Sequence, residues 1–97
     1  MGLNGRMKVK AGYILRKLGP HYIIVGEGIE QMGSSKMLQI NSSAAFVWES
    51  ISAMDSFIVG DVAKLLCSNY GIDMAIAEED AAEIVDTFCR YGLIDCN

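Results

Sequence analysis

The sequence has few of the residues that build metal centres and catalytic sites. It contains one histidine, His21, and three cysteines without a C-x-x-C pair, so we expect no metal ion. No nucleophile, base and orienting group occur in a recognisable pattern, so we expect neither enzymatic activity nor a cofactor. The odd number and irregular spacing of Cys67, Cys89 and Cys96 argue against a disulfide framework and favour a reducing, cytoplasmic location.

Long apolar runs are also missing. No run approaches the roughly 18 residues of a membrane span, and no basic segment followed by an apolar one marks a secretory signal. The glycines from Gly26 to Gly33 do not form a phosphate-binding pattern, so no nucleotide site is expected. The chain is nevertheless 52% hydrophobic over 97 residues, enough for one core. We expect a disordered tail over residues 1–6 and a single domain over 7–97.

Basic residues are scarce in the second half of the chain. Residues 1–48 carry six bases and two acids, whereas residues 49–97 carry two bases and ten acids. One explanation is a partner chosen by charge. The other is an acidic helix face that is simply solvated, and the sequence leaves both open.

Three short segments have the composition of strands, near residues 11–18, 21–25 and 36–40. Gly19-Pro20 marks a turn between the first two, and residues 21–25 are rich in β-branched and aromatic side chains. In the third segment, Leu38 and Ile40 share one face, while Met37 and Gln39 share the other.

Three helices are expected near residues 43–53, 57–70 and 74–91, because apolar residues recur there at helical spacing. Asn41-Ser42-Ser43, Ser56 and Asp73 are candidate N-caps, and Gly71 is a natural left-handed stop. The side chains expected to be among the most buried are Trp48, Leu65, Leu66, Ile84 and Phe88.

This order predicts an α+β domain that is winged helix-turn-helix-like, with three N-terminal antiparallel strands followed by three helices. Such folds usually read DNA. Here the helix in the reading position, within residues 73–92, carries six carboxylates and one base, which DNA phosphates would repel. We therefore expect no nucleic acid. If the third strand is a sheet edge, it can accept an extended peptide instead.

Several motifs, taken in order, resemble one known family. The run LQINSSAAFVWE, residues 38–49, resembles the "LN-x-x-[AG]-x-x-[IVL]-W-E" segment of the PqqD family. KAGYILR at residues 10–16 is similar to that family's opening strand. NYGID at residues 69–73, followed by Asp80, Phe88 and YGLI at residues 91–94, resembles its closing helix. The similarity extends essentially from Met7 to Ile94.

The resemblance implies a non-enzymatic peptide chaperone, of the kind called a RiPP recognition element. Such proteins hold the leader of a ribosomally made precursor and present it to a modifying enzyme, often a radical-SAM iron–sulfur enzyme. In the type member's pathway the product is pyrroloquinoline quinone. The leader adds as a strand beside the third strand, against the third helix. Carried over, this implicates the backbone of Met37, Leu38, Gln39 and Ile40, and a helix wall of Ala82, Val85, Asp86 and Cys89.

This chain departs from the family pattern at two helix positions. Ala81 replaces a larger aliphatic residue and Ile84 replaces a frequent Phe, which predicts a groove of different shape. An interaction or dimerisation module without a leader peptide stays open as an alternative, and so does a DNA-binding winged helix. An exposed strand edge also allows a homodimer.

Overall fold

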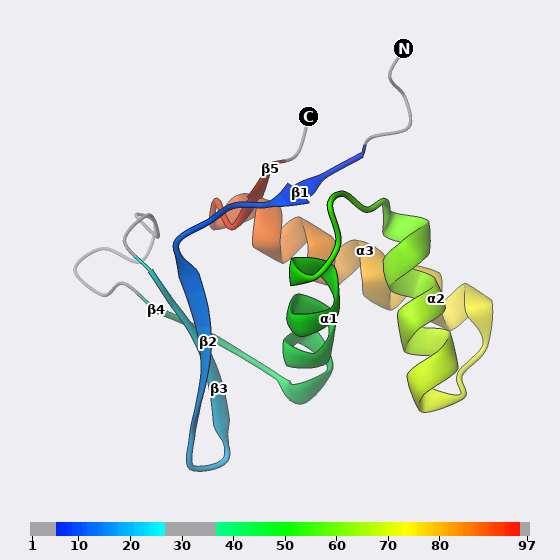
Figure 1. Cartoon of the computed structure of the whole chain (residues 1–97). Helices are drawn as coiled ribbons and strands as arrows, with labels where there is room; N and C mark the ends of the chain where they lie inside the picture. The colour runs from blue at the N-terminus through cyan, green and yellow to red at the C-terminus, as the bar shows by residue number, and fades with distance from the viewer. Residues whose placement is uncertain (1–5, 27–36, 96–97) are drawn as a thin grey trace.

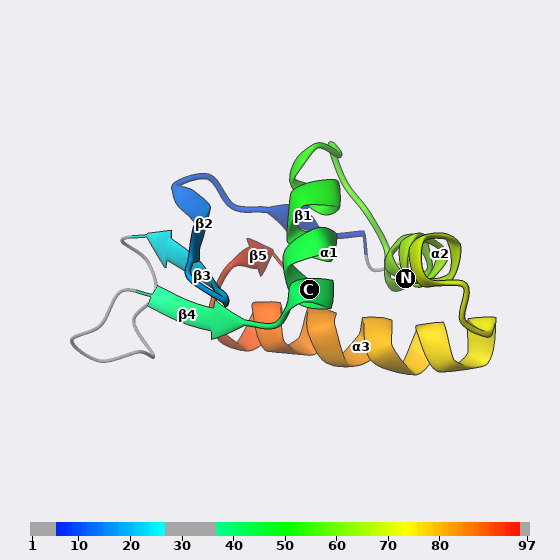
Figure 2. The same ribbon diagram turned by 90° about the horizontal axis from the view of Figure 1, so that it is seen from below.

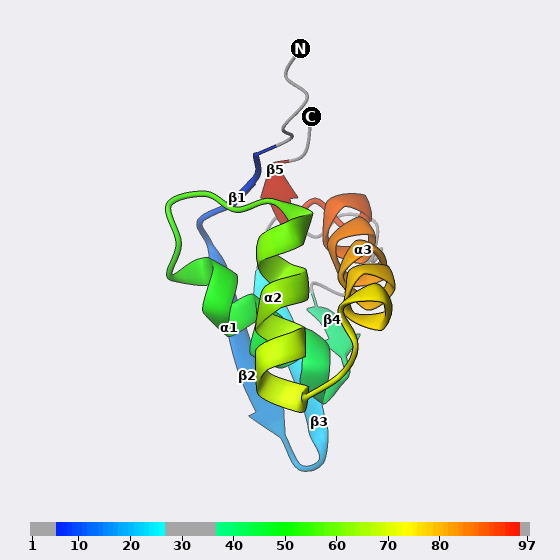
Figure 3. The same ribbon diagram turned by 90° about the vertical axis from the view of Figure 1, so that its right-hand side faces the viewer.

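A computed structural model describes residues 6–26 and 37–95. An antiparallel three-stranded sheet stands on one side of the molecule (Figure 1), in the order β2 (Tyr13–Leu18), β3 (His21–Gly26), β4 (Met37–Ile40). Three helices lie on the other side: α1 (Ser42–Ser52), α2 (Val59–Tyr70) and α3 (Met74–Arg90). Figure 3 shows α2 flanked by α1 and α3. The α+β class and the predicted order of these six elements are confirmed.

Two further strands were not predicted. β1 (Lys8–Val9) and β5 (Ile94–Asp95) form a small antiparallel sheet of their own. Of the predicted tail, residues 1–5 lie outside the described residues, whereas Arg6 donates from Nε to Ser56 Oγ at 2.9 Å. Met7 next to it is buried and forms an isolated bridge with Phe57.

The bridge between Met7 and Phe57 explains why α2 starts later than predicted. The Met7 N–H donates to the Phe57 carbonyl at 2.8 Å, and the Phe57 N–H donates back at 2.9 Å. Phe57 is therefore held in an extended backbone, so Ser56 cannot cap the helix. Instead the Ile58 N–H donates to the Asp61 carboxylate at 3.0 Å, which satisfies one free N–H of the first turn.

The other two predicted caps differ in outcome. Asn41 Oδ1 accepts from the Ala44 N–H at 2.8 Å and caps α1 as predicted. Asp73 occupies the N-cap position of α3, but its side chain makes no capping hydrogen bond. Gly71 ends α2 with a φ of 66°, as expected of a left-handed stop.

The core lies where the sheet, α1 and α3 meet. Trp48 packs edge-to-face on Phe88, with ring centroids 5.4 Å apart, and on Tyr13 at 6.4 Å. Trp48, Leu66 and Phe88 are buried as predicted. Leu65 and Ile84 are only half-buried against this core, because each lies at the margin of its helix's apolar stripe. Leu93 and Ile94 fold back onto the core and are buried.

Candidate functional site

The sheet has a free edge at β4. One side of β4 pairs with β3, with Leu38 opposite Ile24 and Ile40 opposite Tyr22. No described strand pairs with its other side. In an antiparallel strand, alternate residues point their N–H and C=O groups away from the partner strand. Those groups remain available to another extended chain. Figure 2 shows β4 next to the C-terminal half of α3.

A hollow of about 250 Å³ lies between this strand and α3. Its apolar lining comes from Ile40, Ala44, Ile84 and Phe88, and its polar lining from Gln39, Asn41, Glu83 and Thr87. Ligand pockets for small molecules are usually larger, about 300–1,000 Å³. The hollow therefore has the size for one or two side chains of a bound peptide.

The strand residues predicted for the site fall on two faces. Leu38 is buried and Ile40 is half-buried, so both point inward, and Ile40 reaches the hollow. Met37 and Gln39 are exposed on the outer face. There the Gln39 amide hydrogen-bonds with His21 Nδ1 at 3.0 Å. This alternation agrees with the period of two read from the sequence.

The helix residues predicted for the site do not line the hollow. At about 100° per residue, Ala82, Asp86 and Cys89 lie on one flank of α3. Glu83 and Thr87, which do line the hollow, lie on the other flank. Val85 lies on the buried stripe between them and is only 5% exposed. Three of the four predicted wall residues, Ala82, Asp86 and Cys89, thus lie on the flank of α3 that does not line the hollow.

The predicted wall residues have other neighbours. The Asp86 carboxylate pairs with Arg90 one turn later, with 3.0 Å between its Oδ2 and Nη2 of Arg90. Ala82 is exposed. Cys89 is half-buried and disulfide-bonded, although the number and spacing of the cysteines argued against a disulfide framework. Cys67 is a free thiol and donates from Sγ to the Ile72 carbonyl at 3.1 Å.

Of the polar groups on α3 that line the hollow, Thr87 is hydrogen-bonded within the helix and Glu83 has no basic partner among the described residues. Thr87 Oγ1 donates to the Glu83 carbonyl at 3.0 Å, within the helix. No basic side chain among the described residues pairs with the Glu83 carboxylate.

Across residues 6–26 and 37–95, no three His, Cys, Asp or Glu side chains lie close enough to hold a metal ion together. In the same part of the chain no helix is long and apolar enough to cross a membrane.

The sequence model of coenzyme PQQ synthesis protein D (PqqD) matches residues 29–94. The chain belongs to the PqqD family. The match includes β4, all three helices and the start of β5, and therefore both walls of the hollow. No curated protein sequence matches the chain at a significant level.

Two solved structures share the fold of this PqqD-family chain. One is described as TbiB1 in complex with the TbiA(beta) leader peptide: it is 9% identical, with a TM-score of 0.67 over 91% of this chain and 94% of that one. The other is lasso peptide synthetase B1 complexed with the leader peptide: it is 19% identical, with a TM-score of 0.67 over 92% and 96%. At such identities the likeness establishes the fold alone.

Sequence reasoning missed Glu83 and Thr87 as residues facing the hollow. It placed Ile84 in the core and linked it to the shape of the groove, but did not name it as a site residue. The spacing of Ile84 and Thr87, three residues apart beside the apolar stripe, is the signal that marks this flank. This spacing identifies site residues only once the flank of α3 that faces β4 is known.

Proposed function

We propose that this PqqD-family protein is a non-enzymatic chaperone for the leader of a ribosomally made precursor peptide. The observation that carries the proposal is the free edge of β4 beside a hollow with an apolar lining. The two solved proteins of the same fold are each described with a leader peptide. The chain has the elements that strand addition requires, and strand addition requires no catalytic group.

In this proposal the leader pairs with the backbone of Met37, Leu38, Gln39 and Ile40. Backbone pairing supplies affinity with little demand on sequence, and a side chain seated in the hollow supplies selectivity. We replace the wall of Ala82, Val85, Asp86 and Cys89 by Glu83, Ile84 and Thr87, which line the hollow. The carboxylate of Glu83 favours a leader with a basic residue near the seated side chain.

The enzyme that receives the leader is, in this proposal, a radical-SAM iron–sulfur enzyme, as the family resemblance implies. The product is pyrroloquinoline quinone or another modified peptide. Because the precursor is made on ribosomes, we place the protein in the cytoplasm.

Titrations with and without reductant cover both states of the disulfide bond at Cys89.

The test first requires that a short precursor reading frame be identified near this gene. A synthetic leader from that frame is then titrated into the protein, followed by calorimetry and by NMR of the backbone amides. We expect the largest shift changes along residues 37–40 and 83–87. Strand pairing should survive a rise from 50 to 200 mM salt with less than a tenfold loss of affinity. A protein that makes 6–10 phosphate contacts to DNA would lose about 10³–10⁵.

Three results would contradict the proposal. Shifts confined to the β2–β3 hairpin would place the peptide elsewhere, and no binding of the leader would favour an interaction module. Sedimentation that shows a dimer paired through β4 would favour self-association, because a second copy can occupy the same free edge.

A further inference from the structure

The outer face of the three-stranded sheet is unusually apolar for a face that no described element covers. Residues directly opposite one another in neighbouring strands share a face. The register places Ile14, Val25 and Met37 in one such row and Arg16, Ile23 and Gln39 in the next, with Leu18 beside His21. Five of these eight side chains are apolar.

These apolar side chains are accessible. Ile14 is 58% exposed, Leu18 53% and Met37 44%, while Ile23 and Val25 are partly exposed. An antiparallel sheet with one buried face normally carries polar residues on the other. Here the buried face holds Leu15, Ile24 and Leu38, so the sheet is apolar on both sides. Contiguous exposed apolar surface of this kind marks interaction sites.

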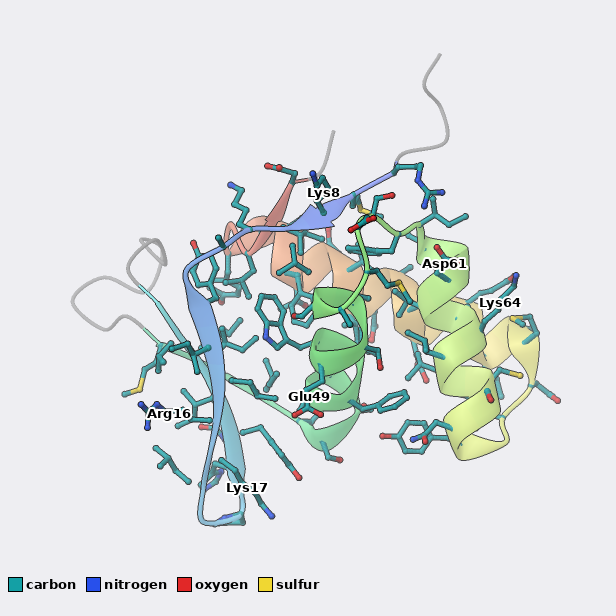
Figure 4. All side chains as sticks on the ribbon, viewed as in Figure 1. Lys8, Arg16, Lys17, Glu49, Asp61 and Lys64 are labelled. Atoms are coloured by element: carbon teal, nitrogen blue, oxygen red, sulfur yellow. The ribbon has the colours of Figure 1, made fainter. Side chains whose placement is uncertain are left out.

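The charge on this outer face has one sign. β2, β3 and β4 contain no Asp or Glu. Arg16 lies in the middle of the face, and Figure 4 shows its side chain projecting away from α1, whereas Lys17 projects from the opposite side of the strand. No described carboxylate pairs with Arg16. An apolar surface with a central, unpaired arginine has the composition of a protein interface, where Arg is enriched.

We propose that this outer face docks a second protein, whose surface is apolar and presents a carboxylate to Arg16. Given the proposed function, on which this identification rests, that protein is the modifying enzyme. A second copy stacked face to face would bring two Arg16 side chains and two His21 side chains together without a carboxylate between them. Charge complementarity therefore favours a different protein.

The outer face is continuous with the proposed leader site. Met37 and Gln39 of β4 belong to the outer face, and Gln39 and Ile40 of the same strand also line the hollow. A leader strand added to the free edge of β4 would extend the outer face by one strand. Every second leader side chain would then lie beside Met37 and Gln39. The docked enzyme would thus contact both the sheet and the bound leader, and the leader should raise the affinity of the enzyme for this protein.

The decisive variants are Arg16→Glu and its matched control Lys17→Glu. Both change the net charge equally, at adjacent exposed positions of β2, but on opposite faces of the sheet. The probe is the modifying enzyme identified from the genes near this one, titrated by calorimetry with and without the leader. We expect Arg16→Glu to weaken enzyme binding at least tenfold and Lys17→Glu less than threefold. Neither should change leader affinity more than twofold.

A double variant, Ile14→Thr with Leu18→Thr, tests the apolar part while keeping β-branched residues that suit a strand. We expect at least a tenfold loss of enzyme binding with unchanged circular dichroism. Three outcomes would overturn the docking proposal. Arg16→Glu and Lys17→Glu could have equal effects, all variants could bind the enzyme as the wild type does, or the wild-type protein could fail to bind the enzyme. Self-association that these variants abolish would also overturn it. If the enzyme binds through the outer face but no leader binds β4, docking stands and the leader function falls.

Discussion

Thr87 and Ala82 lie on opposite flanks of α3, about 140° apart around the helix axis. Thr87 lines the hollow beside β4 and is half-buried. Ala82 is exposed on the other flank and does not line the hollow. The proposed leader site therefore includes Thr87 and excludes Ala82, which is only five residues away in the sequence.

Thr87→Trp should block the hollow, because an indole ring would occupy the space proposed for a leader side chain. We expect leader affinity to fall at least tenfold, or about 1.4 kcal/mol, by calorimetric titration. Ala82→Trp adds the same ring on the other flank and serves as the control, with less than a twofold change. Equal losses for both variants would mean that α3 does not contact the leader through the flank that lines the hollow.

The contrast between Thr87 and Val85 shows what helical spacing alone can predict. The apolar stripe of α3 was recognisable from Ala77, Ala81 and Phe88, all of which are buried. A stripe identifies the buried side of a helix but does not say which neighbour flanks it on the left or right. That depends on how α3 crosses the sheet, which is set by contacts between distant residues. Val85, which the sequence placed in the groove, is 5% exposed and does not line the hollow.

At the scale of elements, β4 and α1 are joined with a single residue between them, Asn41. Its side chain caps α1 and also accepts from Ser43 Oγ at 3.1 Å. The same residue lines the hollow. The end of the proposed peptide-pairing strand and the start of a core helix are therefore fixed by one side chain.

Asn41→Ala removes the oxygen that accepts from the Ala44 N–H, so it should lower the free energy of unfolding by about 1 kcal/mol. Ser42→Ala, at the next residue, removes a hydroxyl outside this capping arrangement and should change stability by less than about 0.5 kcal/mol. Urea unfolding without leader measures both. A loss for Ser42→Ala as large as that for Asn41→Ala would mean that the cap contributes little.

The elements that sequence reasoning placed less well depend on distant partners. The cap of α1 was predictable because Asn41 acts on a residue three positions away. The late start of α2 was not, because the bridge that holds Phe57 extended comes from Met7 near the other end of the chain. The two-residue strands β1 and β5 are likewise too short for a period of two to be visible, and only their pairing defines them.

On the scale of the whole molecule, one side chain connects the layers. Trp48 of α1 is 4% exposed and contacts Tyr13 from β2 and Phe88 from α3. Replacing it would open a cavity where the sheet meets the helices. Packing around the buried indole of Trp48 therefore supports the shape of the hollow between β4 and α3.

Trp48→Ala should cost about 3–5 kcal/mol of folding free energy, as removal of large buried aromatic side chains does. The control is Ile14→Thr, at a position that is 58% exposed, with an expected change within about 0.5 kcal/mol. Thermal and urea unfolding compare the two. A small loss for Trp48→Ala would show that the contacts between α1, β2 and α3 do not depend on the indole.

The pairing of β1 with β5 has a practical meaning for how this domain can be joined to other chains. Lys8 lies opposite Asp95 and Val9 opposite Ile94, so the two ends of the described chain emerge at one pole (Figures 1 and 3). The tip of the β2–β3 hairpin is at the far pole. A linker, a fluorophore or a host protein's loop could therefore be spliced onto either end, or onto both at once, without crossing the sheet.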